Sequence, residues 1–329
     1  MHVQNFAKKC SKLKILLHVS TAYVNGTRAG VIAETPIHMG EALAGAKVSY
    51  VDINTEKEIV EEKLRELEAL NLSQKEITSV MKDLGFERAR LHGWPNTYVF
   101  TKAMGEMLLE ETKEIGYKAV ILRPTIITST YREPFPGWVQ GLRTLDALFA
   151  VHGKAKTTFF IGDPQSTIDI VPGDMVVNSM VAAVAKHSNQ SSNHLTIYHV
   201  GSSTRNPISY KDILSLMYHY LLQHPFLDDG GKPIKMLKFL NVLCCDIMGR
   251  SYTNSRRALD HVMRLAEVYK PYLFFQGIFD DANTEGLRVA TRQQDSDVDD
   301  MFGFDPKCIP WEEYFMNTHF PGIVKYSLK

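Results

Sequence analysis

The sequence predicts an α/β protein, in which helices cover a doubly wound parallel sheet and a mainly helical C-terminal part follows. Residues 14–20 and 118–122 are apolar at successive positions, which is typical of parallel strands buried on both faces. A helical pattern separates the two runs, and strand, helix, strand in this order indicates a βαβ unit. From about residue 208 the pattern changes to long apolar helices.

Composition excludes several classes of partner. The 329 residues suffice for one large or two ordinary domains, and 37 basic residues balance 37 acidic ones. With no net charge to attract polyanions, we expect no nucleic-acid partner. The four cysteines have no zinc-like spacing, which predicts free thiols in a reducing compartment and no metal site.

Two strands carry polar groups where they end. The first strand ends in Ser20-Thr21, and ligand groups gather at the carboxyl ends of parallel strands. Turn capping is the other interpretation of these hydroxyls. The second strand, 118–122, is followed by Arg123-Pro124, and the proline predicts that a loop begins there.

Residues 55–85 differ in character from their surroundings. They are rich in Glu and Lys, and Thr55 to Glu58 and Ser73 to Glu76 both fit the capping box at a helix start. Apolar residues recur at helical spacing after each box. We therefore expect two surface helices that form an insertion with a solvated charged face.

Tyr98 and Lys102 lie four residues apart at the start of a predicted helix, so both side chains point to one face. An ammonium beside a phenol lowers the pKa of the phenol and favours its use as a proton donor. A chain of this composition contains about one such pair by chance. The hydroxyls of Ser20 and Thr21 supply the context that makes the pair a candidate site.

The remaining elements complete the predicted layout. Strands are expected at 158–161, 167–171 and 195–201, and Asp174 is expected to cap a helix that carries Val177, Val181 and Val184. The broad apolar face of 236–248 allows two interpretations, packed core or peripheral contact with lipid. The aromatic segments 271–277 and 311–320 are expected to pack the C-terminal part.

Thr21, Tyr98 and Lys102 occur in the order used by extended short-chain dehydrogenase/reductases. Longer motifs narrow the resemblance: residues 18–26, 93–102, 134–138, 171–178 and 311–322 are similar to the plant, male-sterility type of alcohol-forming fatty acyl-CoA reductase. The matching motifs run in the family's order through nearly the whole chain.

This resemblance implies NADPH-dependent reduction of a long-chain fatty acyl-CoA to an aldehyde and then a primary alcohol, with release of CoA. It implies Tyr98 as the acid, Lys102 as its tuning cation and ribose contact, and Thr21 or Ser20 as a second hydroxyl. Residues Arg123, Pro124, Thr125 and Ile126 would lie beside the nicotinamide. It also implies an intracellular location, at the endoplasmic reticulum surface or in a plastid, with peripheral membrane contact.

One motif of the family is missing. No Gly-x-x-Gly-x-x-Gly turn occurs among the 21 glycines, and this turn holds the cofactor diphosphate. The resemblance therefore implies the C-terminal part of a Rossmann-like sheet whose first strands are missing. We expect a partial NAD(P)-binding domain at 1–207 and a helical domain at 208–329.

Three functions follow as alternatives. One is an active fatty acyl-CoA reductase, and another is a truncated, inactive member that acts at most as a lipid or partner binder. The third is a reductase of a different carbonyl, such as a nucleotide sugar, against which the C-terminal aromatic motifs argue.

Overall fold

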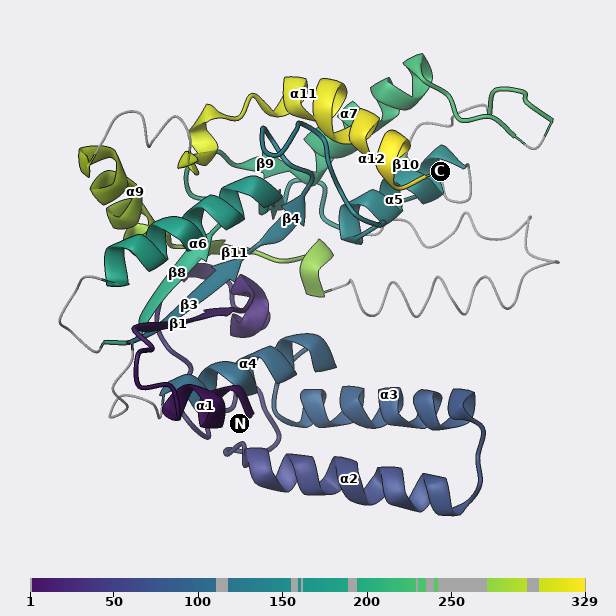
Figure 1. Cartoon of the computed structure of the whole chain (residues 1–329). Helices are drawn as coiled ribbons and strands as arrows, with labels where there is room; N and C mark the ends of the chain where they lie inside the picture. Colours follow the sequence, from purple (N-terminus) through teal and green to yellow (C-terminus); the bar gives the residue numbers. More distant parts are fainter. Residues whose placement is uncertain are drawn as a thin grey trace.

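The computed structural model describes residues 2–110, 118–154, 159–160, 162–188, 194–228, 230–234, 240–241, 271–294 and 302–328 (Figure 1). The helices are α1 (His2–Lys8), η1 (Ala22–Asn25), α2 (Ile53–Ala69), α3 (Gln74–Leu91), α4 (Thr97–Glu110), α5 (Thr144–Gly153), α6 (Gly173–Ser188), α7 (Tyr210–Gln223), α9 (Ala282–Gln294), η3 (Pro306–Cys308), α11 (Trp311–Tyr314), η4 (Phe315–His319) and α12 (Phe320–Tyr326). The strands are β1 (Ile15–Val19), β2 (Gly30–Ile32), β3 (Lys118–Pro124), β4 (Ile126–Thr128), β5 (Phe159–Phe160), β6 (Thr167–Ile168), β7 (Ile170–Pro172), β8 (Thr196–Val200), β9 (Ile208–Ser209), β10 (Leu240–Asn241) and β11 (Gly277–Phe279).

A parallel sheet of β1, β3 and β8, in that order, forms the centre of the molecule. Val19 pairs with Leu122, and Leu122 pairs with Tyr198, so the three strands end at one edge of the sheet. Helix α6 lies on one face of this sheet and α4 on the other (Figure 1). The predicted parallel α/β sheet is therefore confirmed, and β1 is its edge strand within the described residues.

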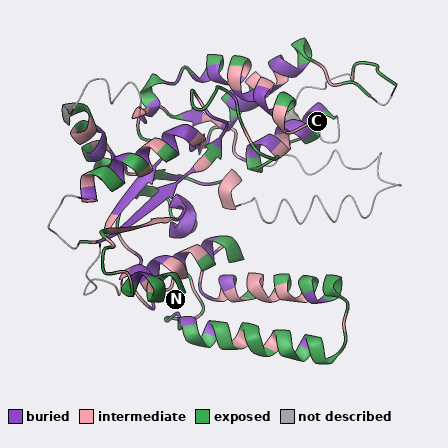
Figure 2. Ribbon diagram, in the orientation of Figure 1, coloured by how far each residue is buried: buried purple, intermediate pink, exposed green. Residues whose placement is uncertain are grey.

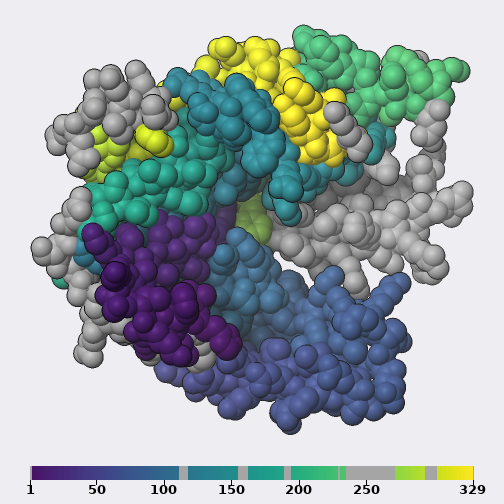
Figure 3. Space-filling view, viewed as in Figure 1, coloured from purple at the N-terminus to yellow at the C-terminus, as the bar shows by residue number. Residues whose placement is uncertain are grey.

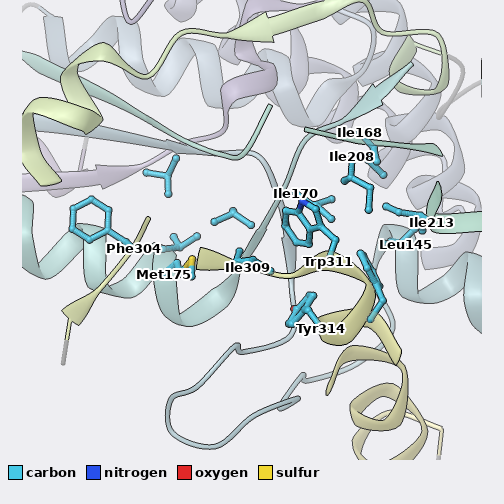
Figure 4. Close-up of a cluster of buried hydrophobic side chains, with 14 of the residues drawn as sticks. Leu145, Ile168, Ile170, Met175, Ile208, Ile213, Phe304, Ile309, Trp311 and Tyr314 are labelled. Carbon is cyan, nitrogen blue, oxygen red and sulfur yellow. The ribbon is translucent and has the colours of Figure 1, made fainter. Parts of the chain in front are cut away.

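One hydrophobic cluster joins the sheet to the C-terminal segment. It contains Val120 and Leu122 of β3, together with side chains from α5, α6, α7 and α11 to α12. Figure 4 shows Trp311 and Tyr314 of this segment among Ile170 and Ile208. The aromatic segment 311–320 thus packs as expected. The domain division at 207 and 208 stays a prediction.

Helices α2 and α3 form the predicted surface hairpin, which extends from the body with a largely exposed outer face (Figures 2 and 3). The capping box between Ser73 and Glu76 is confirmed. The box predicted at Thr55 is wrong, because α2 begins earlier and Asp52 is its N-cap. The Asp52 carboxylate accepts hydrogen bonds from two backbone amides and so satisfies the free donors of the first turn.

Helix α6 carries the predicted valines on its exposed face, and its predicted cap is wrong. Val177, Val181 and Val184 are exposed, with fractions of 54%, 45% and 38%, because α6 buries the opposite face, which includes Met175 and Ala183. Asp174 does not cap this helix. Its carboxylate accepts hydrogen bonds from the backbone amides of residues 131, 132 and 133, and thereby holds the aromatic loop that follows β4.

Most of the segment 236–248, where we predicted an apolar helix, lies outside the described residues. Among the helices of the described ranges, none combines the length and the apolar character that crossing a bilayer requires.

Candidate active site

The carboxyl ends of β1 and β3 bring the predicted hydroxyls to one place. The Ser20 amide donates to the Leu122 carbonyl at 2.7 Å, which extends the pairing of the two strands by one residue. The Thr21 hydroxyl donates to the carbonyl of Pro124 at 3.4 Å. Ser20, Thr21 and Pro124 therefore lie together at the edge where parallel sheets bind ligands, as the sequence predicted.

The two hydroxyls differ in their bonding. Thr21 is the N-cap of η1, and its Oγ1 also accepts from the Tyr23 amide at 3.4 Å. Ser20 is 5% exposed, and its Oγ has no hydrogen-bond partner among the described residues. A buried hydroxyl without a partner is costly, and a ligand oxygen would remove that cost. The Thr21 hydroxyl thus caps η1, while the Ser20 hydroxyl is available to hydrogen-bond a ligand.

Tyr98 lies in the first turn of α4, and its side chain is 57% exposed. Helix α4 packs against η1, the turn that starts directly after Thr21. Within the described residues the phenol makes no hydrogen bond to Thr21 or to Lys102. The exposed Tyr98 side chain is therefore accessible to a ligand.

The pKa relationship predicted between Tyr98 and Lys102 is wrong for this structure. Partial burial raises the pKa of Tyr98 above its usual value of 10. Lys102 does not counter this effect, because its ammonium donates to the carbonyl of Val19 at 3.0 Å instead of facing the phenol. The spacing of four residues gave the correct helix face but not the partner of the ammonium.

The predicted role of Arg123 as a cofactor contact also needs correction. Its guanidinium is fully buried and binds both carboxylate oxygens of Glu106, with Nη2 2.6 Å from Oε2. Its Nη1 lies 3.3 Å from Nε2 of His199. Arg123 therefore joins β3 to α4 and β8 and has no exposed surface for a ligand.

The residues after Arg123 keep their predicted location at the strand end. The Thr125 amide donates to the Val200 carbonyl at 3.0 Å, and Ile126 donates to the carbonyl of Asp169 at 3.1 Å. Ile126 is half-buried, whereas Thr125 is buried. Cofactor binding by Pro124, Thr125 and Ile126 stays a prediction.

Sequence reasoning missed several polar residues beneath this site. His18 lies on β1, Glu106 on α4 and His199 on β8, and none belongs to a short motif with a known spacing. Burial, together with the Arg123 charge, lowers the pKa of His199 to about 3. The signal in the sequence was a histidine inside each of two mainly apolar strands.

Comparison with known proteins identifies the family of the chain. An NAD-binding family profile described as male sterility protein matches residues 1–180, and a second profile, Sterile, with the same description matches residues 232–329. The alcohol-forming fatty acyl-CoA reductase of Simmondsia chinensis is 44% identical in an alignment of 353 positions, which covers 99% of this chain and 71% of that protein. Fatty acyl-CoA reductase 1 of Arabidopsis thaliana is 43% identical and covers 100% of this chain and 71% of its own length. Fatty acyl-CoA reductase 2 of Homo sapiens is 24% identical, and the match covers 98% of this chain and 60% of that protein.

Proposed function

The chain belongs to the male sterility family of fatty acyl-CoA reductases, and we propose that Tyr98, Lys102 and Ser20 carry its reaction with NADPH as the reductant. The enzyme reduces a fatty acyl-CoA to a primary alcohol and uses a nicotinamide cofactor. The comparisons favour this function over the inactive alternative. The observation that carries the site proposal is at the end of β1, where Lys102 binds the Val19 carbonyl and the next residue, Ser20, has a buried hydroxyl without a partner among the described residues. Tyr98 lies one helix turn before Lys102 and is exposed.

The residues at this edge fit the nicotinamide end of the cofactor. When bound, the nicotinamide supplies hydride to a carbonyl carbon. Lys102 would hold the ribose with the donors that Val19 leaves free, and the backbone near Thr125 would border the ring. The chain lacks the glycine-rich turn that usually holds the diphosphate, so the proposed contacts concern this end of the cofactor alone.

The substrate carbonyl would lie between Ser20 and Tyr98. Ser20 Oγ would donate a hydrogen bond to the carbonyl oxygen and stabilise the negative charge that develops there. Tyr98 would give its proton to the same oxygen as hydride reaches the carbon. A phenol with a raised pKa is fully protonated at neutral pH and so holds a proton to give, although it is a weaker acid than a phenol beside an ammonium.

Two reductions follow with the same groups. In the thioester step, Tyr98 takes its proton back when the carbon–sulfur bond breaks, and CoA leaves with a proton from solvent. In the aldehyde step, the Tyr98 proton stays on the alcohol, and the phenol is then reprotonated. One phenol thus serves both steps without a second acid at the carbonyl.

The finer parts of the proposal are the preference for NADPH, the long acyl chain and the location. An intracellular location at the endoplasmic reticulum surface or in a plastid, with peripheral membrane contact, stays part of the proposal. It is supported by the resemblance of the sequence motifs to the plant branch of the family.

The proposal is tested by titrating the purified chain with NADPH and by measuring fatty alcohol formed from a long-chain acyl-CoA. We expect saturable binding and alcohol formation, and a loss of turnover of roughly a hundredfold or more in Tyr98→Phe. Tyr326→Phe is the matched control, because it removes a phenol hydroxyl from α12 and leaves the ring against Phe135. Absence of both binding and alcohol would instead support the inactive alternative.

A further inference from the structure

His18 lies on the same face of β1 as Ser20, because alternate residues of a strand point to the same side. This face is covered by α4. The His18 imidazole lies against Gly105, where an added Cβ would be 3.6 Å from Nε2 and 3.7 Å from Cε1. These are ordinary contact distances, so the imidazole lies close to α4 at Gly105.

The His18 Nε2 atom is buried and has no hydrogen-bond partner among the described residues. It shares this property with Ser20 Oγ, two residues further along the strand. Buried polar atoms are nearly always satisfied in folded proteins, and an unsatisfied one calls for an explanation. Two such atoms on one strand face, beside a candidate active site, indicate a functional arrangement.

Lys102 is the donor that suits this acceptor. It lies three residues before Gly105, so both residues occupy the helix face that covers β1. Its ammonium binds the carbonyl of Val19, the residue that follows His18 in the chain. An ammonium has three donors, and within the described residues Lys102 uses one of them.

We propose that His18 is a positioning residue for Lys102: its Nε2 accepts a second hydrogen bond from the ammonium, directly or through one water, when Lys102 binds the cofactor. Val19 and His18 then hold Nζ at two points, and its third donor faces the cofactor ribose. This inference rests on the proposed reductase function, since it assigns a role within that site.

The charges around His18 make the arrangement dependent on pH. Burial lowers the pKa of His18 below its usual 6.5, and the positive charge of Lys102 lowers it further, while Glu106 on the same helix opposes both. From β3, Arg123 faces Glu106 and neutralises part of that opposition. His18 is therefore neutral at neutral pH and can accept a hydrogen bond. At acid pH, protonation removes the acceptor and places a second positive charge beside Lys102.

Two substitutions separate positioning from packing. His18→Gln keeps an acceptor that does not titrate, whereas His18→Phe keeps a ring without an acceptor. We expect His18→Phe to lower kcat/KM for NADPH about tenfold and His18→Gln to stay within about threefold of the native enzyme. The acid-side decline of kcat/KM that His18 produces should be absent in His18→Gln. Equal activities and equal pH profiles for the two variants would overturn the proposal.

A second measurement does not depend on turnover. The pKa of His18, followed by NMR of its imidazole, should rise in Lys102→Met, because the neighbouring positive charge is removed. Lys47→Met, on the loop before α2, is the matched control and should leave the pKa unchanged. An unchanged pKa in Lys102→Met would show that the two groups do not face each other. If the native chain formed no alcohol but the pKa of His18 rose in Lys102→Met as expected, the result would count against the proposed function alone.

Discussion

The Arg123 guanidinium and the Glu106 carboxylate form a fully buried ion pair that joins β3 to α4, the helix that carries Tyr98 and Lys102. The side chains are 0% and 1% exposed. Since the guanidinium binds both carboxylate oxygens, the pair fixes the rotation of α4 as well as its distance from the sheet. The position of the candidate catalytic phenol thus depends on two residues that do not touch a ligand.

Removing one partner of this pair should destabilise the protein strongly. Glu106→Gln leaves the buried Arg123 charge without a counter-charge, and we expect the free energy of unfolding to fall by about 3 to 5 kcal/mol. The double variant Glu106→Leu with Arg123→Met, which buries apolar groups of similar size, should recover most of this loss. Urea unfolding measures both values. Equal stability of Glu106→Gln and the native chain would contradict the prediction.

The two hydroxyls at the end of β1 should respond differently to alanine. Ser20→Ala removes an unpartnered hydroxyl, so stability should stay nearly constant while kcat/KM falls roughly a hundredfold. Thr21→Ala removes the N-cap of η1 and should lower the free energy of unfolding by about 1 kcal/mol. Steady-state kinetics and thermal melts of both variants test this. The reverse pattern would assign the carbonyl contact to Thr21.

Glu34 and His199 should have opposite effects on stability as the pH changes. Burial raises the pKa of Glu34 from 4.5 to about 7, so between these values the folded state binds more protons and stability falls as pH rises. The pKa of His199 is lowered from 6.5 to about 3, so in that window the unfolded state binds more protons and stability rises with pH. Each effect has a slope of about 1.4 kcal/mol per pH unit, so they nearly cancel between pH 4.5 and 6.5.

Glu34→Gln should reveal the pH dependence of stability that His199 contributes, because the opposing titration of Glu34 is removed. The variant no longer titrates at residue 34, so its stability should rise with pH between 4.5 and 6.5, where that of the native chain is nearly flat. Urea unfolding at several pH values measures the difference in slope, which does not depend on the absolute stability of the variant. Parallel curves for the two proteins would show that the pKa of Glu34 is not raised.

Close packing between Gly137 and Gly322 should make position 322 intolerant of a side chain. A Cβ at Gly322 would collide with the Gly137 carbonyl, and Gly137 itself has a φ of +81° that favours glycine. We expect Gly322→Ala to cost about 1 to 3 kcal/mol, because α12 must move away from the aromatic loop after β4. Gly286→Ala in α9 is the control: among the described residues, nothing beyond its own helix backbone lies within 4 Å of an added Cβ, and helix propensity favours alanine by up to about 1 kcal/mol. Thermal melts should therefore shift in opposite directions.

Local pattern predicted the elements of this fold well. The apolar runs gave β1 and β3, and the capping box at Ser73 gave the start of α3, because these signals depend on neighbouring residues. The start of α2 was misplaced, since Thr55 and Asp52 can both cap a helix and only the described structure selects Asp52. The outward orientation of Val177 on α6 was not predictable either, because the buried face of the helix is set by its packing against the sheet and α9.

The sequence by itself determined that hydroxyls follow the first parallel strand, that Tyr98 and Lys102 share one helix face, and that the chain resembles the fatty acyl-CoA reductases. The tertiary structure decided that Lys102 binds the Val19 carbonyl and that Arg123 is buried with Glu106. It also decided that His18 and Ser20 keep buried atoms without partners among the residues that the structure describes. The physical reason is the range of the interactions. Periodicity and capping act between residues a few positions apart, whereas the ion pair and the hydrogen bonds of this site join residues that are 17 to 103 positions apart.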